Sequence, residues 1–298
     1  MNINYKGSFV ALITPFLNNK IDEKAFQKFI EWQISEGTSG LVPCGTTGES
    51  PTLSHTEHER LIDLTLEVSN KRVPVMAGTG SNSTEEAISL TKFARKAGAD
   101  AALVVMPYYN KPTQEGMFAH FKAINDAVDI PIFIYNIPGR SVVDMSIDTM
   151  VKLAKLPNII GVKDASNDPI RPTLLRNALE GREFIMFSGE DPSQLPFMVS
   201  GGDGIISVTA NVAPKLMSKF HNLWNDNEVS KARSLQEQMM ALHMSLFVET
   251  SPGPVKFAAS LLDICDGSLR LPLVKPNDST KDLITNALEN LQLISKKG

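Results

Sequence analysis

The sequence predicts a (β/α)8 TIM barrel followed by a C-terminal helical extension. Short apolar segments alternate with amphipathic segments through residues 1–224, and strands that are apolar on both faces are typical of parallel sheets covered by helices. Eight such pairs match a closed barrel, a fold that exceeds 250 residues as one unit. An open doubly wound sheet is the alternative, but no G-x-G-x-x-G motif follows the first predicted strand.

The predicted strands are short apolar runs bounded by turn residues or polar residues. The first belongs to SFVALITPFL, which could mimic a signal peptide. It is short, Pro15 interrupts it, and no small-residue cleavage site follows, so we interpret it as a strand. The predicted strands are residues 8–14, 40–44, 73–78, 101–106, 131–136, 159–164, 184–188 and 204–208.

The segments between the strands have apolar residues at helical spacing. In residues 83–97, Ser83 and Glu86 predict a capped start, and Gly98 predicts the end. A glycine similarly precedes an apolar strand in EGTSGLVPCG and SGGDGIISV, which indicates a repeated unit. The predicted barrel helices are residues 22–36, 55–69, 83–97, 114–128, 146–155, 169–180, 192–199 and 213–224.

The strand pattern stops after residue 224. Three further helices are predicted, and SPGP and LPLVKP interrupt them. We therefore expect a catalytic barrel over residues 1–224 and a helical domain over residues 225–298. The predicted tail helices are residues 227–248, 254–264 and 279–295.

Composition and charge exclude several classes of protein. The net charge is −4 and basic residues form no cluster, which argues against nucleic acid and anionic membranes as partners. No run reaches the roughly 18 apolar residues of a membrane span. Two cysteines, Cys44 and Cys265, are too few for a disulfide framework and fit a reducing compartment. We expect a cytoplasmic protein.

Catalytic groups of this barrel lie at the carboxyl ends of its strands. Here those ends carry many hydroxyls, one lysine and no histidine. The five histidines fall in predicted helices or just before one, which disfavours metal-assisted aldol chemistry and a Ser-His-Asp triad. Glu190 and Asp191 follow the seventh strand and would repel a phosphate group, so phosphosugar chemistry is also disfavoured.

Lys163 ends the apolar run IIGV. Burial at the mouth of a barrel disfavours the ammonium form and frees the amine to form a Schiff base with a carbonyl compound. Neighbouring hydroxyls could then move protons. The alternative is a lysine that extends from the strand end to water, paired with Asp164.

The segment GTTGES, residues 45–50, is the second candidate. Glycines on both sides of two threonines allow the backbone to approach a small ligand closely. Hydroxyl and amide N–H groups at such a loop suit a carboxylate. The alternative is a polar turn into the next helix.

Five motifs, in order along the chain, resemble the dihydrodipicolinate synthase family of pyruvate-dependent class I aldolases. They are GTTGES, PYYNKPTQEG, YNIPGRS, GVKDAS and GIISVTAN. The resemblance spans essentially the whole chain, including FVETSPGPVKFA in the helical tail. It implies a synthase that condenses pyruvate with L-aspartate 4-semialdehyde in lysine and diaminopimelate biosynthesis, without a metal or an organic cofactor.

The resemblance also implies a role for each matching residue. Lys163 would form the Schiff base with pyruvate. Tyr135, Thr46 and Tyr109 would relay protons, and Tyr109 would come from a neighbouring subunit. Among the substrate-binding residues, Arg140 would hold the carboxylate of the aldehyde substrate. The other three would surround pyruvate: Thr47, Gly189 and Ile206.

A second site is implied for L-lysine as an inhibitor at a dimer interface. Glu86 could pair with an ammonium group of this ligand. Pro51 departs from the alanine that many lysine-sensitive relatives carry, and a stiffer turn could alter the affinity. The matching positions are Ser50, Pro51, Leu53, His55, His58, Asn82, Glu86 and Tyr108.

The resemblance further implies a homotetramer built as a dimer of dimers. Two other functions stay open. The first is a related pyruvate aldolase or lyase that acts on a sugar acid, which shares the lysine and the tyrosine. The second is a non-catalytic barrel that senses pyruvate or lysine, although a sensor would not need the proton relay.

Overall fold

The computed structural model describes residues 3–296, and these form two compact units. The first unit contains residues 3–6 and Pro74–Ile206, and the second contains Gly7–Val73 and residues 207–296. All eight predicted strands are present and pair in parallel with helices between them, so the predicted (β/α)8 barrel class is confirmed. The predicted division into a catalytic barrel over residues 1–224 and a helical domain over residues 225–298 stays a prediction.

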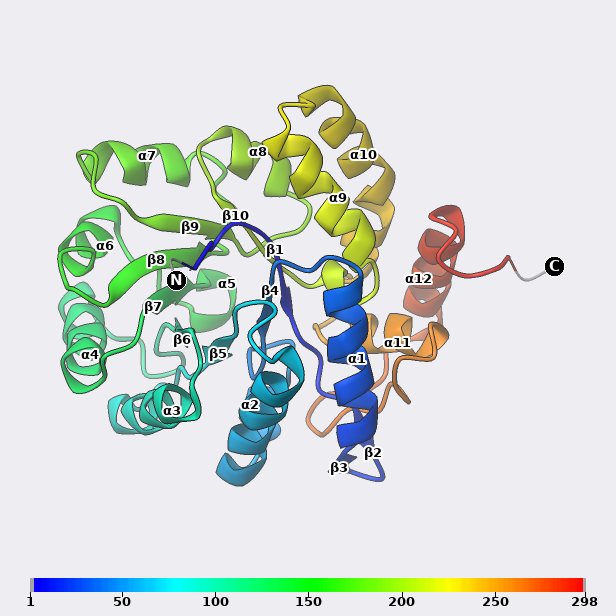
Figure 1. Cartoon of the computed structure of the whole chain (residues 1–298), viewed down its shortest axis with the longest axis horizontal. Helices are drawn as coiled ribbons and strands as arrows, with labels where there is room; N and C mark the ends of the chain where they lie inside the picture. The colour runs from blue at the N-terminus through cyan, green and yellow to red at the C-terminus, as the bar shows by residue number, and fades with distance from the viewer. Residues whose placement is uncertain (1–2, 297–298) are drawn as a thin grey trace. The chain divides into compact units, whose positions relative to one another are not determined.

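In the first unit, parallel strands alternate with helices that lie outside them (Figure 1). Strands β5 to β9 pair in sequence order, and β9 also pairs with β10. The elements are β5 (Met76–Gly78), α3 (Thr84–Ala97), β6 (Ala101–Val105), α4 (Gln114–Ala127), β7 (Ile132–Asn136), α5 (Pro138–Ser141), α6 (Ile147–Leu153), β8 (Ile159–Asp164), α7 (Arg171–Ala178), β9 (Ile185–Ser188), α8 (Gln194–Val199) and β10 (Gly204–Ser207), whose last residue counts with the second unit.

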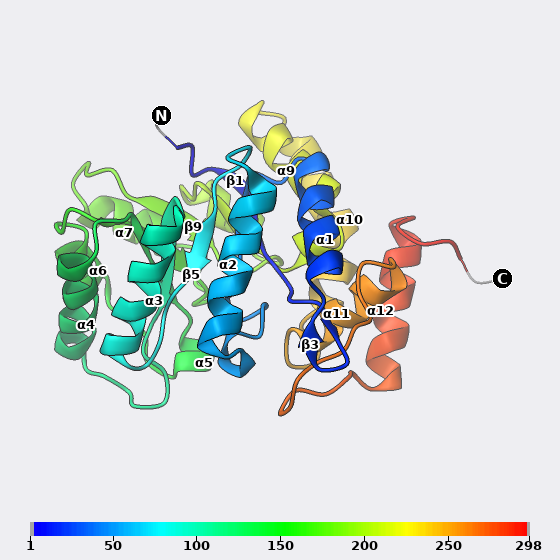
Figure 2. The same ribbon diagram turned by 60° about the horizontal axis from the view of Figure 1, so that its bottom comes forward.

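The second unit joins the first two barrel strands to the C-terminal helices. Strand β1 pairs in parallel with β4, and α12 packs against α10 and α11, as Figure 2 shows. The elements are β1 (Gly7–Ala11), β2 (Phe16–Leu17), β3 (Lys20–Ile21), α1 (Glu23–Ser35), β4 (Gly40–Val42), η1 (Ser50–Thr52), α2 (His55–Ser69), η2 (Thr209–Asn211), α9 (Pro214–Asn225), α10 (Val229–Ser245), α11 (Gly253–Leu261) and α12 (Asp278–Asn290).

Several short elements were not expected from the sequence, and two of them have a clear local cause. The first is the β2–β3 hairpin, whose turn residues Asn18 and Asn19 have φ values of 52° and 63°. Asparagine tolerates this left-handed conformation, which two-residue hairpin turns require. The second is α5, where Pro138 stands in the first turn and supplies a preformed φ angle. Both elements are too short for hydrophobic periodicity to detect.

The core of the first unit lies between its strands. Phe133 and Phe187 are fully buried, and their ring centroids are 5.7 Å apart. Gly161 on β8 leaves room for them, because a Cβ at this position would lie 2.5 Å from a ring atom of Phe133. The aromatic packing and the missing side chain together fix the position of β8, which ends in Lys163 and Asp164.

Candidate active site

Lys163 and Tyr135 lie side by side at the carboxyl ends of two paired strands. The register of β7 with β8 places Tyr135 opposite Lys163. The lysine Nζ lies 4.3 Å from the centroid of the tyrosine ring. Both side chains are buried, with 5% and 6% of their surface exposed. The structure therefore brings together the amine and the phenol that the sequence identified.

Burial is the main influence on the pKa of Lys163. It lowers the pKa of the ammonium group to about 8, and the Arg140 guanidinium lowers it further, whereas Glu190 and Asp191 raise it. With a pKa near 8, about one amine in ten is neutral at pH 7. This is a far larger neutral fraction than an exposed lysine has, so the side chain is suited to attack a carbonyl carbon.

Glu190 is an acidic neighbour of Lys163 whose influence on the amine was not predicted from the sequence. Burial raises its pKa to about 7, and the Lys163 ammonium opposes this rise. Its backbone N–H donates to the Ser188 hydroxyl at 3.2 Å, which fixes the loop after β9. An acidic pair directly after a strand end was the signal in the sequence that could have revealed this role.

A polar network joins the residues that follow Tyr135 and Lys163. Asn136 Nδ2 donates to Asp164 Oδ2 at 3.2 Å and to Asp144 Oδ1 at 2.8 Å. Arg171 Nε forms an ion pair with Asp164 Oδ2 at 2.9 Å. Burial raises the pKa of Asp164, and Arg171 lowers it. Successive strand residues point to opposite faces, so Asp164 pairs with this arginine while Lys163 faces Tyr135.

Arg140 lies on α5, directly after the strand that carries Tyr135, and its side chain is exposed. It is close enough to lower the pKa of both Lys163 and Glu190. Two further residues of this unit, Gly189 and Ile206, are predicted to line the pyruvate pocket, and each is held by packing or a hydrogen bond. Gly189 N–H donates to the Asp164 carbonyl at 2.7 Å, and Ile206 is fully buried on β10.

Tyr108 and Tyr109 follow β6, and their exposures differ. Tyr109 is 88% exposed and has a φ of 72°, a conformation that non-glycine residues rarely adopt. Tyr108 is half-buried. The loop is tied to its neighbour by Asn110, whose Nδ2 donates to the Asn82 carbonyl at 2.8 Å. An exposed aromatic side chain in a fixed loop suits contact with another molecule.

Thr46 and Thr47 lie in a tight turn of the second unit, after β4. Gly48 N–H donates to the Gly45 carbonyl and Glu49 N–H to the Thr46 carbonyl, both at 3.1 Å. Thr47 is buried, whereas Thr46 is partly exposed. That these two threonines share a site with Lys163 stays a prediction.

The eight candidate lysine-binding residues are divided between the units. In the first unit, Glu86 near the start of α3 accepts a hydrogen bond from the Ser81 hydroxyl. In the second unit, His58 is buried on α2, and its carbonyl accepts from Cys44 Sγ at 3.5 Å. The positions by unit are Asn82, Glu86 and Tyr108 in the first, and Ser50, Pro51, Leu53, His55 and His58 in the second.

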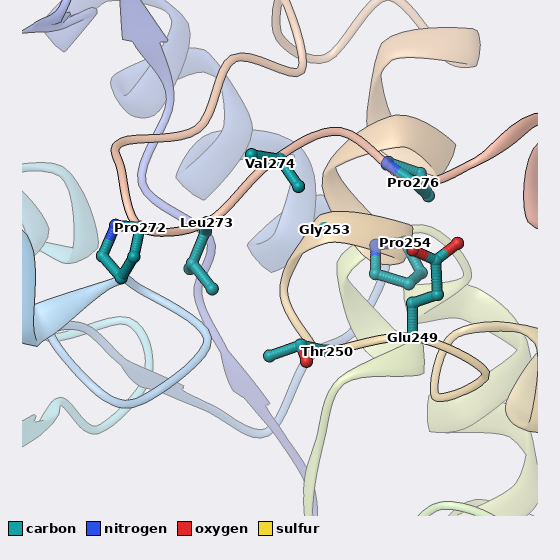
Figure 3. A pocket seen from close by; sticks show the side chains of 8 residues that line it. All are labelled: Glu249, Thr250, Gly253, Pro254, Pro272, Leu273, Val274 and Pro276. Carbon is teal, nitrogen blue, oxygen red and sulfur yellow. The ribbon is translucent and has the colours of Figure 1, made fainter.

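A cavity of about 270 Å³ lies in the second unit, and its lining includes none of the candidates named from the sequence. Figure 3 shows its walls, with Pro272 and Leu273 across from Glu249 and Pro254. Glu249 Oε1 accepts from the Asn277 backbone N–H at 3.0 Å. The wall thus consists of the start of α11 with the segment before it, and of the segment that precedes α12.

Residues 3–296 contain neither a cluster of metal-ligating side chains nor a helix that could span a membrane. Among these residues, no three His, Cys, Asp or Glu side chains gather closely enough to hold a metal ion. None of the helices in the same range has the length and apolar character needed to cross a membrane.

Comparison with known proteins gives full-length matches. The sequence model of the Dihydrodipicolinate synthetase family matches residues 4–291. A 4-hydroxy-tetrahydrodipicolinate synthase of Rhodospirillum centenum is 62% identical over 292 residues, which are 98% of this chain and 100% of that protein. One of Parvibaculum lavamentivorans is 55% identical over 291 residues, again 98% and 100% of the two chains.

Two solved structures are similar to this chain over almost their whole length. The dihydrodipicolinate synthase of Acinetobacter baumannii, chloride inhibited and complexed with pyruvate, is 46% identical with a TM-score of 0.94, covering 97% of this chain and 99% of that chain. The synthase of Cyanidioschyzon merolae with lysine bound is 35% identical with a TM-score of 0.94, covering 98% and 100%.

Proposed function

The chain belongs to the dihydrodipicolinate synthetase family, and we propose that its reaction proceeds through a Schiff base between Lys163 and pyruvate. The synthase activity, that of a lyase, follows from relatives that match over the full length. The observation that supports the mechanism most strongly is the buried Lys163 amine, with a pKa near 8, beside the Tyr135 ring.

The first step forms the imine. The neutral Lys163 amine attacks the C2 carbonyl carbon of pyruvate, and the resulting carbinolamine loses water. Tyr135, whose ring centroid lies 4.3 Å from the lysine Nζ, relays the protons that these steps require. Thr46 and the partner subunit's Tyr109 complete the relay. Thr47 binds the pyruvate carboxylate, and the backbone of Gly189 and Ile206 lines the pocket.

The second step forms the carbon–carbon bond. The imine loses a proton from the methyl carbon and becomes an enamine, which attacks the aldehyde carbon of L-aspartate 4-semialdehyde. Arg140 holds the carboxylate of this substrate, as its planar pair of donors favours. The substrate amine then attacks the imine carbon, closes the ring and releases Lys163. No metal or organic cofactor takes part.

The assembly and cellular role follow from the same proposal. Tyr109, which is 88% exposed, would reach the site of a neighbouring subunit, so the enzyme would be active as a homo-oligomer, a tetramer formed from two dimers. The product would enter lysine and diaminopimelate biosynthesis in the cytoplasm. L-Lysine would inhibit at the site that includes His58 and Glu86.

Borohydride reduction in the presence of pyruvate, followed by peptide mass mapping, tests the Schiff base. The label should appear on Lys163 alone, and turnover by Lys163→Ala protein or a label on another side chain would refute the mechanism. Arg140→Ala should raise the KM for the semialdehyde more than that for pyruvate. Faster turnover with pyruvate and a sugar-acid aldehyde would favour the related aldolase instead. Full activity in millimolar L-lysine would reject inhibition.

A further inference from the structure

A second lysine, Lys256 on α11, is buried completely and has no part in the reaction described above. Its Nζ donates to Glu49 Oε1 at 2.7 Å and to the Thr14 carbonyl at 2.8 Å. The ammonium also lies 4.3 Å from the centroid of the Phe16 ring. Neither the lysine nor the carboxylate has any exposed side-chain surface.

Glu49 belongs to the turn that carries the two threonines. Its backbone N–H donates to the Thr46 carbonyl at 3.1 Å, and its φ is 58°. Its second carboxylate oxygen accepts from the backbone N–H of Arg270 at 3.1 Å. The residue is thus held through its side chain from the C-terminal segments, and its backbone closes the turn.

The hydrogen bond from Lys256 to Thr14 connects the lysine to the same turn by a second route. Thr14, whose carbonyl accepts from the lysine, donates through Oγ1 to the Gly48 carbonyl at 2.7 Å. One buried ammonium therefore connects to Glu49 directly and to Gly48 through Thr14. Gly48 and Glu49 are the two residues that come after Thr46 and Thr47 in the chain.

The free-energy cost of burying the Lys256–Glu49 ion pair indicates the role of the pair. Removing two opposite charges from water costs free energy that their attraction often fails to recover, so apolar residues of similar volume usually stabilise a fold at least as well. Directional hydrogen bonds, unlike apolar contacts, fix the orientation of the groups they join. The Lys256 pair is therefore better suited to holding the geometry of the turn than to stabilising the fold.

We propose that Lys256 is a positioning residue, which holds the 45–49 turn in the conformation that binds the pyruvate carboxylate. This inference rests on the proposed role of Thr47 and assigns a function to the helical tail. Lys256 does not contact the substrate and acts through Glu49 and Thr14.

The experiment compares four proteins: the wild type, Lys256→Met, the double variant Lys256→Met/Glu49→Gln, and Lys231→Met as a control. Lys231 is an exposed lysine of α10 in the same unit. The double variant leaves neither charge unpaired in the interior, so it keeps the test valid if the single variant fails to fold. The KM for pyruvate, the KM for the semialdehyde, kcat, and the borohydride trapping rate are measured, with melting curves for each protein.

A displaced threonine turn should weaken pyruvate binding selectively. We expect the pyruvate KM of the folded double variant to rise on the order of tenfold or more, with a slower trapping rate. The semialdehyde KM should change little, and Lys231→Met should match the wild type. A lower active fraction alone would reduce the apparent kcat and leave both KM values unchanged.

An unchanged pyruvate KM in the double variant would overturn the positioning role, as would equal increases in both KM values. The wild-type trapping result separates this outcome from failure of the proposed function. If pyruvate labels Lys163 in the wild type and the double variant binds pyruvate normally, only the role of Lys256 is refuted. If the wild type is not labelled at Lys163, the Schiff-base mechanism itself fails.

Discussion

Replacing Lys163 with methionine should abolish activity and stabilise the protein at neutral pH. Burial of the side chain, which is 5% exposed, lowers the pKa of the amine from 10.5 to about 8. Each pKa unit corresponds to 1.36 kcal/mol of differential stability, so at pH 7 the buried ammonium costs about 3 kcal/mol of folding free energy. Methionine has a similar length and carries no charge.

The stabilisation should depend on pH with a definite sign. Below pH 8 the amine is protonated in both the folded and the unfolded chain, so the full cost is present. Between about 8 and 10.5 the folded amine is neutral while the unfolded amine keeps its proton. The wild type therefore gains stability as the pH rises through this window, and the advantage of Lys163→Met should disappear by its upper end.

Thermal unfolding at pH 7 and at pH 10.5 measures the effect. For a chain of 298 residues, 3 kcal/mol corresponds to an increase in Tm of about 5 °C. Lys155→Met is the matched control, because Lys155 is an exposed lysine of the same unit, and its Tm should equal that of the wild type at both values. A variant that is not stabilised at pH 7, or is stabilised equally at both values, would refute the account of Lys163.

Three further predictions concern the same unit. The rate of borohydride trapping should rise about tenfold per pH unit below pH 8 and level off above it, and a rate that still climbs above pH 9 contradicts this. Glu190→Gln should move the midpoint of this pH profile to lower pH, because the carboxylate raises the pKa of Lys163. Gly161→Ala should lower the free energy of unfolding by about 1–3 kcal/mol, because its Cβ would lie 2.5 Å from an aromatic ring atom. Gly139→Ala, where a Cβ meets nothing within 4 Å, should leave the denaturant midpoint unchanged, and equal midpoints for both variants would argue against the steric reason. Asn136→Ala removes the donor to two carboxylates. It should lower the free energy of unfolding by about 1–3 kcal/mol and also lower kcat. A wild-type kcat in the folded variant would show that this network does not order the strand ends.

Local patterns in the sequence predicted the barrel strands and the longer helices of the fold. The helix at Thr84–Ala97 begins and ends where its capping residues predicted, because Ser83 Oγ accepts from the Glu86 N–H and Gly98 has a φ of 99°. Strand ends were less accurate: the strand predicted at residues 8–14 spans Gly7–Ala11. Strand ends depend on pairing with a neighbour, which periodicity does not report.

The sequence also identified the residue types of the candidate site. Lys163 and Tyr135 were recognised as a buried amine and a phenol at strand ends, since parallel strands bring their carboxyl ends to one edge. The influence of Glu190 on the amine was missed, because a pKa depends on distances and burial. Asp164 was considered a partner of Lys163, and the structure pairs it with Arg171 instead.

By itself, the sequence determined the fold class, the family and the amine that we propose for the chemistry, since each of these follows from local order along the chain. Only the tertiary structure decided that Tyr135 faces Lys163, that the pKa of the amine falls to about 8, and that Lys256 is held to Glu49. The lysine and the carboxylate of this last pair are 207 residues apart. Register, burial and contacts between distant residues arise from packing in three dimensions, and no local pattern encodes them.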